Sequence, residues 1–240
     1  MSTKGSSWIA VCVLGVVAGA GLLYWGGGNS PDRRPPAETD PAVLLQPAAM
    51  DERAPAGTPR YSLAEAQAEG LVRAETVGRN ASSGDALVIA VERLADRDID
   101  VYIAPGTVFV PGGDVQRMVA WGVVGVIVPP NTAMQPTTSM YLPTPDLHVF
   151  IVEAYCLDFK LENPTVNDVF QVQAEPHARA AQIIREGKNE GLSINAIQSA
   201  IWIEEDHLTK HEIQTKFDAS DKEIEDAFEM LKRTPRLKRK

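Results

Sequence analysis

Residues 148–159, HVFIVEAYCLDF, are the stretch on which the fold prediction rests. Apolar side chains occupy most positions of this run, and successive side chains of a strand point to opposite faces of a sheet. A strand that is apolar on both faces is covered on both, so the run predicts a central strand. Cys156 would share one of these faces with Phe150, Val152 and Ala154.

Three runs upstream of this stretch are also strand-like. They are 86–94 (ALVIAVERL), 100–109 (DVYIAPGTVF) and 115–128 (VQRMVAWGVVGVIV). Pro105 and Gly106 interrupt the second run with a turn or bend, and Gly122 and Gly125 in the third run are candidate β-bulges. Short strands separated by Pro and Gly turns, with no helices between them, predict an antiparallel β-sandwich or barrel.

Helical signals lie on both sides of these strands. Ser62 with Glu65 fits a capping box that opens a short helix through Glu69. In the last third of the chain we expect helices over 176–186, 193–205, 209–217 and 220–233. The first of them should end near Gly187, because glycine commonly terminates helices. The predicted fold class is α+β, an antiparallel β-sandwich or barrel closed by C-terminal helices.

The N-terminus carries a candidate membrane segment. Residues 8–25 are uncharged, and at about 1.5 Å per residue they span roughly 27 Å, close to the thickness of a bilayer's hydrocarbon core. Trp8 and Trp25 stand at its two ends, where aromatic rings prefer the membrane interface. Residues 18–20, Ala-Gly-Ala, alternatively form the cleavage site of a signal peptide. Either interpretation predicts an extracytoplasmic protein, membrane-anchored or secreted, whose orientation the flanking charges do not decide.

The remaining segments complete the predicted organisation. Residues 26–60 hold seven of the 17 prolines and predict an extended spacer. The last nine residues hold six basic side chains, which suit contact with an anionic polymer. The predicted divisions are an N-terminal cap (1–7), a transmembrane anchor or signal segment (8–25), a Pro-rich linker (26–60), a folded domain (61–233) and a basic tail (234–240).

Composition argues against several classes of function. The net charge is −9 despite the basic tail, and so acidic a body argues against nucleic acid as a partner. Two cysteines, of which Cys12 lies in the hydrophobic segment, exclude a disulfide framework and a four-cysteine zinc site. His207 and His211 lack a third ligand at a diagnostic spacing and are interpreted as part of a solvated helix. We expect no cofactor and no metal.

Cys156 is therefore the lone thiol of the folded domain. A free thiol outside the cytoplasm requires burial, pairing with another chain or a chemical role. Burial alone is a sufficient explanation, because free cysteine commonly behaves as a small buried hydrophobe.

Gln198 is the second unusual residue. It lies within the apolar stripe of the helix over 193–205, which consists of Ile194, Ile197, Ile201 and Trp202. A buried carboxamide without a partner costs about 1–3 kcal/mol, so a partner is expected. Hydrogen bonds to the backbone of a strand are one solution. Attack by the Cys156 thiol is another: it displaces ammonia and leaves an internal thioester, which an amine or hydroxyl can open.

Two short motifs resemble those of a known family. Tyr155-Cys156-Leu157 resembles the aromatic-Cys-hydrophobic signature of the thioester domains of bacterial surface proteins, and IQSAIW at 197–202 resembles their second signature, hydrophobic-Gln-x-x-hydrophobic-hydrophobic. The resemblance implies that Cys156 and Gln198 form the thioester. The residues expected to line its pocket are Tyr155, Leu157, Ile194, Ile197, Ile201 and Trp202.

The resulting functional hypothesis is a thioester-type domain, residues 61–233, that attaches once to an amine- or hydroxyl-bearing surface protein or glycan and is not a turnover enzyme. The alternative is a non-covalent binding or structural module of the cell envelope with a buried Cys156. A third possibility is a Cys-dependent hydrolase that pairs Cys156 with His148, His177 or His207.

Overall fold

The computed structural model of the chain describes residues 54–127 and 133–235. The predicted anchor or signal segment at 8–25 and most of the predicted linker lie outside the described residues, as does the tail from 236 onward. Among the helices of the described ranges, none is both long and apolar enough to cross a bilayer.

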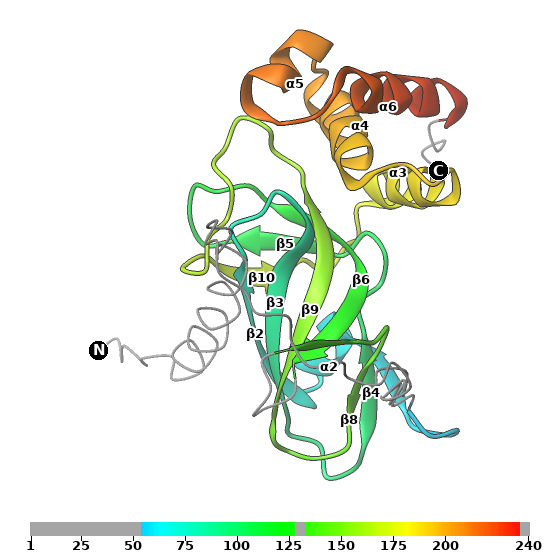
Figure 1. Cartoon of the computed structure of the whole chain (residues 1–240). Helices are drawn as coiled ribbons and strands as arrows, with labels where there is room; N and C mark the ends of the chain where they lie inside the picture. Colours follow the sequence, from blue (N-terminus) through cyan, green and yellow to red (C-terminus); the bar gives the residue numbers. More distant parts are fainter. Residues whose placement is uncertain (1–53, 128–132, 236–240) are drawn as a thin grey trace, which may run out of the picture.

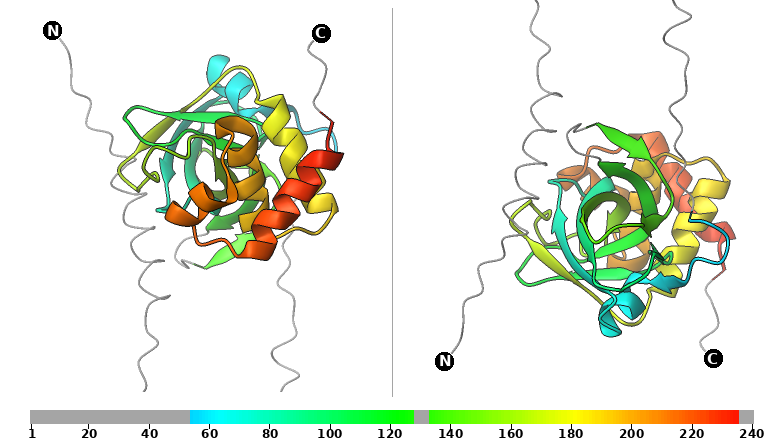
Figure 2. Two further views of the ribbon diagram at one scale, coloured as in Figure 1. Left: turned by 90° about the horizontal axis from the view of Figure 1, so that it is seen from above. Right: turned by 90° about the horizontal axis from the view of Figure 1, so that it is seen from below.

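Six strands close into a barrel, which is seen from the side in Figure 1 and end-on in Figure 2. They are β2 (Val72–Gly78), β3 (Ser83–Arg93), β5 (Val108–Pro111), β6 (Met118–Ile127), β9 (Leu147–Cys156) and β10 (Val169–Val172). The strand order is β5-β10-β2-β3-β9-β6, and pairing of β5 with β6 closes the ring. Every pairing within the ring is antiparallel. The antiparallel barrel is therefore confirmed, and of the two predicted architectures the sandwich is not the one formed.

The prediction of a central strand is confirmed in β9. It pairs with β3 along one edge and with β6 along the other, and it is buried from Val149 to Cys156. Phe150, Val152, Ala154 and Cys156 share the core cluster inside the barrel. On the other face of β9, Tyr155 packs with α3 and α4, and Val149 and Ile151 are buried in a cluster with residues of β2, β3 and β6, so the run shows no polar alternation.

Glycine positions along β6 help the sheet to curl. The register between β6 and β9 shifts between Ala120 and Gly122 and again between Val123 and Gly125, as expected for bulges at the two glycines. A bulge adds a residue to one strand and bends it, which favours closure of a sheet into a barrel. The interruption predicted at Pro105 and Gly106 is also present, between β4 (Ile99–Tyr102) and β5.

Five strands were not predicted from the sequence. β2 and β10 belong to the barrel, β7 (Met134–Pro136) extends the sheet beyond β6, and β1 (Arg60–Ser62) with β8 (Met140–Leu142) flanks β4 in a three-stranded sheet ordered β1-β4-β8. Four of the five have three or four residues, too few to show a period. β2 carries polar side chains inside its run, VRAETVG, which hides its apolar face.

The helices follow the predictions closely. They are α2 (Leu63–Ala68), α3 (Ala178–Asn189), α4 (Ile194–Asp206), α5 (Lys210–Lys216) and α6 (Asp221–Arg233). The capping box of Ser62 and Glu65 is present, and Ser193 caps α4. The last four helices gather over one end of the barrel, with α4 packed against β9 (Figure 1).

The predicted end of α3 was wrong. The helix continues past Gly187 to Asn189, and the left-handed glycine that follows it is Gly191, with φ 70°. Gly187 is buried against α4, where an added Cβ would lie 2.6 Å from Cγ1 of Ile197. Its glycine is required by close helix packing rather than by helix termination.

Candidate functional site

Cys156 and Gln198 meet at the junction of the barrel with the helices. Cys156 is the last residue of β9, and Gln198 lies in the second turn of α4. Oε1 of Gln198 accepts the Cys156 backbone N–H at 2.9 Å, and Nε2 donates to the Cys156 carbonyl oxygen at 2.8 Å. Both residues are fully buried. The carboxamide therefore engages both backbone polar groups of one residue, as a neighbouring strand would.

The junction lies where strand pairing ends. β3 pairs with β9 up to Ser83 opposite Tyr155, and the Cys156 N–H is shared between the Ser82 carbonyl at 2.9 Å and Gln198. Beyond this point β9 continues into a loop. A buried backbone carbonyl at a strand end needs a donor, and the amide of Gln198 supplies it.

The Cys156 thiol points away from water into the barrel. Its Sγ lies 3.2 Å from Sδ of Met118, the residue directly opposite it on β6. Burial raises the pKa of the thiol, and the charge of Asp158 raises it further against the opposing effect of Lys216. At neutral pH the group is therefore a protonated thiol rather than a thiolate.

The predicted lining residues divide between two clusters. Tyr155 and Leu157 pack with Ile197 and Ile201 on the outer face of β9, beneath α4. Trp202 instead joins the cluster that contains Cys156.

Ile194 is the exception among the predicted lining residues. It is 46% exposed, because the first residue of α4 extends to the edge of the barrel beside Gly84. The apolar stripe therefore begins one turn later than expected.

Charged residues that were not predicted as part of the site lie beside the junction, and we call them the charged rim. It consists of Arg117, Asp158, His177, Arg179, Glu204, Glu205 and Asp206. Arg117 Nη2 lies 2.6 Å from Oδ1 of Asp158, and the Arg117 backbone N–H donates to Oδ2 at 2.9 Å. The three consecutive acids that follow Trp202 in the sequence are the signal that could have revealed part of this rim.

Two of the three acids bind the start of α3, and the third binds the loop after β9. Glu204 pairs with Arg179 of α3 at 3.1 Å, and Glu205 lies 3.3 Å from Nε2 of His177, the N-cap of α3. Asp206 accepts the backbone N–H of Phe159, in the loop after β9, at 2.8 Å. The C-terminal end of α4 is thereby fastened to both the helices and the barrel.

These contacts shift the pKa values of the rim. The hydrogen bond and charge of Glu205 raise the pKa of His177 although burial opposes them, and His177 in turn lowers the pKa of Glu205. Burial alone would raise the pKa of Asp158, but the hydrogen bonds and charge of Arg117 bring it below its ordinary value. The pairs His177–Glu205 and Arg117–Asp158 therefore each favour the charged forms of their partners.

The four histidines lie on different elements. His207 is the left-handed C-cap of α4, with φ 57°, whereas His211 belongs to α5. Within residues 54–127 and 133–235, no group of three or more His, Cys, Asp or Glu side chains is arranged to hold a metal ion. His148 is eight residues from Cys156 along β9, roughly 26 Å at the rise of a strand, and His177 is occupied by Glu205 and the Ala180 N–H.

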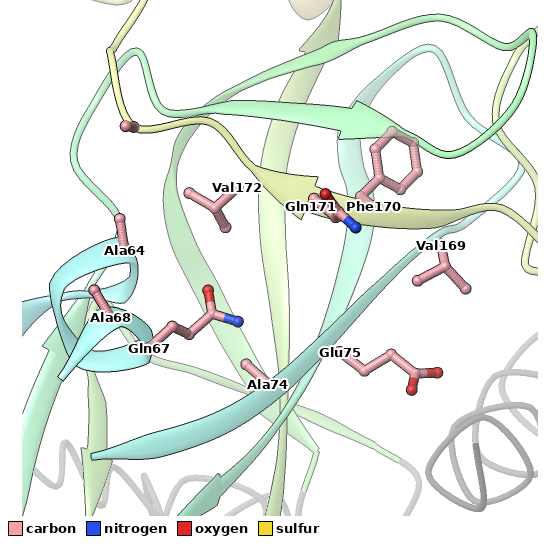
Figure 3. A pocket seen from close by; sticks show the side chains of 10 residues that line it. Ala64, Gln67, Ala68, Ala74, Glu75, Val169, Phe170, Gln171 and Val172 are labelled. Carbon is pink, nitrogen blue, oxygen red and sulfur yellow. The ribbon is translucent and has the colours of Figure 1, made fainter. Parts of the chain in front are cut away.

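A separate groove lies on the barrel wall (Figure 3). It has a volume of about 580 Å³ and runs between α2, β2 and β10. Its lining consists mainly of small apolar residues with Gln67, Glu75 and Gln171 at the edges. None of the residues of the Cys156–Gln198 junction or of the charged rim contributes to it.

Comparison with known proteins finds no match for this chain among protein-family models, curated proteins or solved structures. The site is therefore interpreted from its own geometry.

Proposed function

We propose that the domain forms an internal thioester between Cys156 and Gln198 and uses it for a single covalent attachment to a surface partner. The observation that carries the proposal is the seating of the Gln198 carboxamide on the backbone of Cys156, fully buried, with both of its polar atoms hydrogen-bonded there. Two residues 42 positions apart are thus held with the carbonyl carbon beside the residue that bears the thiol.

The hydrogen bonds hold the Gln198 carboxamide on the Cys156 backbone, whereas Sγ must still turn toward it. Sγ of Cys156 bonds to Cδ of Gln198, the Cδ–Nε2 bond breaks, and the thiol proton leaves with the nitrogen as ammonia. The Cys156 N–H donates to Oε1, where negative charge develops in a tetrahedral intermediate. Because the raised pKa of the thiol disfavours a free thiolate, the thiol proton must pass to the leaving nitrogen as the C–S bond forms.

One movement is required before the bond can form. Sγ lies against Sδ of Met118, and rotation about the Cα–Cβ bond of Cys156 is the change available to direct it toward Cδ. The product is sheltered by Tyr155, Leu157, Ile197 and Ile201, which are all buried. An incoming amine or hydroxyl would take the acyl group of Gln198 and release the Cys156 thiol, so the protein acts once.

Intact-mass measurement of the full-length chain tests the proposal. Loss of ammonia lowers the mass by about 17 Da, and methylamine then adds about 31 Da to the thioester form. Cys156→Ala should abolish both changes. Cys12→Ser is the matched control, because it removes the other cysteine of the chain and should retain both. The thioester would be refuted by a measured mass equal to that calculated from the sequence, together with a Cys156 thiol that reacts fully with a thiol reagent after denaturation.

A second function is favoured by the same hydrogen bonds and the Met118 contact. The carboxamide is satisfied without any reaction, and the thiol is packed against Met118 as a small apolar group. On this reading the domain is a non-covalent binding or structural module of the cell envelope, and Gln198 fastens α4 to the barrel. It predicts that Cys156→Ala leaves partner binding unchanged, whereas the thioester proposal predicts its loss.

For the covalent function we propose an extracytoplasmic location, with the chain secreted or anchored through residues 8–25. The partners would be surface proteins or glycans that bear amines or hydroxyls, and the basic tail would contact an anionic polymer. Support comes from the sequence: the uncharged N-terminal run, the Pro-rich spacer and the cluster of basic residues at the C-terminus. Treating intact cells with an added protease would test the location, because an extracytoplasmic domain is accessible to the protease and a cytoplasmic domain is protected from it.

A further inference from the structure

We infer that α5, together with Phe217, is a lid over the Cys156–Gln198 junction, and that Lys216 is the latch which controls access of nucleophiles to Cys156. The inference rests on the proposed function for its consequence, but the lid itself can be tested on the thiol alone.

The latch is a pair of hydrogen bonds to the loop after β9. Lys216 Nζ donates to the Phe159 carbonyl oxygen at 2.9 Å and to the Leu161 carbonyl oxygen at 2.6 Å, and it lies 5.7 Å from the centroid of the Phe159 ring. This loop begins at Leu157, directly after Cys156, so Lys216 holds α5 on the segment that leaves the reactive strand. Its charge also acts on the Cys156 thiol.

Three aromatic rings form the cover beneath the latch. Trp202 makes edge contacts with Phe159 and with Phe217, each with ring centroids 5.0 Å apart. Trp202 is four residues after Gln198 on α4, and long helical side chains lean back over the preceding turn. The rings of Phe159, Trp202 and Phe217 therefore lie between the junction and α5.

The lid itself is weakly anchored. Of the seven residues of α5 only Ile213 is buried. The other polar side-chain contacts from α5 to another element, from Lys210 and Gln214, go to α6 and not to the barrel. A segment with few buried contacts and exposed hydrogen bonds opens more readily than the core around it. In Figure 1, α5 lies at the outer edge of the helical layer, above the loop that follows β9.

The lid would separate formation of the thioester from its opening by a nucleophile. The junction can form its bond in a closed, dry pocket, while a nucleophile reaches it only when α5 lifts from the Phe159–Leu161 loop. Breaking the latch should accelerate every reaction that needs access to Cys156 and should leave the bond-forming pair itself unchanged.

The first measurement does not depend on a thioester. In the full-length chain with Cys12→Ser and Gln198→Met, Cys156 cannot be acylated and is the only thiol. Gln198→Met also removes both hydrogen bonds to the Cys156 backbone, so all rates are compared within this one background. The rate of its reaction with a methanethiosulfonate reagent, without denaturant, should rise about tenfold on adding Lys216→Met, because hydrogen bonds to a charged group no longer oppose opening. Lys216→Arg should restore a slow rate. Lys222→Met is the matched control, since that lysine is exposed on α6 and pairs only with Asp226.

The second measurement uses the wild-type Gln198. Methylamine incorporation, followed by intact mass, should be about tenfold faster in Lys216→Met than in Lys222→Met. Phe217→Leu should raise both rates and provides an independent variant if Lys216→Met folds poorly. Equal reaction rates of Lys216→Met and Lys222→Met with the thiol reagent would overturn the lid. Absence of the ammonia loss would overturn the thioester while leaving the lid to stand on the thiol rates.

Discussion

The Cys156–Gln198 junction and the charged rim lie beside each other and share α4, yet they are held in different ways. At the junction, an uncharged carboxamide and a protonated thiol are fully buried among apolar side chains. On the rim, charged groups whose side chains are 12–46% exposed pair across the barrel, α3 and α4. Buried hydrogen bonds are costly to break because an unsatisfied group remains, whereas exposed ion pairs contribute little and respond to salt and pH. Substitutions at the junction should therefore lower the free energy of unfolding more than substitutions on the rim.

The largest expected effect is at the junction. Gln198→Ala removes two buried hydrogen bonds and leaves a cavity, so the free energy of unfolding should fall by about 3–4 kcal/mol. Urea denaturation of the full-length chain measures it. Gln214→Ala is the control, because that exposed glutamine bonds only Asp221 and its loss should cost less than about 0.5 kcal/mol. A loss below about 1 kcal/mol for Gln198→Ala would mean that the junction does not dominate.

A smaller effect is expected on the rim. Arg117→Met removes the partner of Asp158, and because the arginine side chain is 46% exposed, the loss should be about 1 kcal/mol. Lys232→Met, which breaks the more exposed pair with Glu229, serves as the control and should cost less. Raising the salt concentration should reduce the difference between wild type and Arg117→Met. Identical losses in Lys232→Met and Arg117→Met would contradict a special role for the rim.

The smallest effect should be a pH dependence from His177. The folded-state pKa of His177 is raised above 6.5, so its stabilisation is complete below that pH and is lost as the pH rises through the folded pKa. Between pH 6 and 8 the wild type should lose up to about 1 kcal/mol relative to His177→Asn, which retains an N-cap for α3 without a titrating group. Denaturation midpoints across this range test it, and parallel curves for the two proteins would be the contrary result.

The local signals of the helices were sufficient to predict them. Ser62, Ser193 and Ser220 each accept the backbone N–H expected of a cap, and the helices begin where these residues predict. The long apolar run of β9 was equally clear, because a strand buried on both faces carries apolar side chains at successive positions. These features depend on neighbours within a few positions, which is why one sequence reveals them.

Barrel closure and the rim were not predicted for the opposite reason. β10 has four residues and no visible period, yet it joins β2 to β5 and so completes the ring. Arg117 and Asp158 are 41 positions apart and carry no motif. Gly187 was misread as a helix end because its reason, the close approach of Ile197, lies on another helix.

For the candidate site, the sequence alone determined that a lone thiol on a buried strand and a carboxamide on an apolar helical stripe both needed an explanation. Only the tertiary structure decided that they meet, that the carboxamide binds the backbone of Cys156, and that the thiol faces Met118. The physical reason is that a hydrophobic period reports which face of an element is buried. It does not report which distant element covers that face, since this depends on the packing of the whole chain.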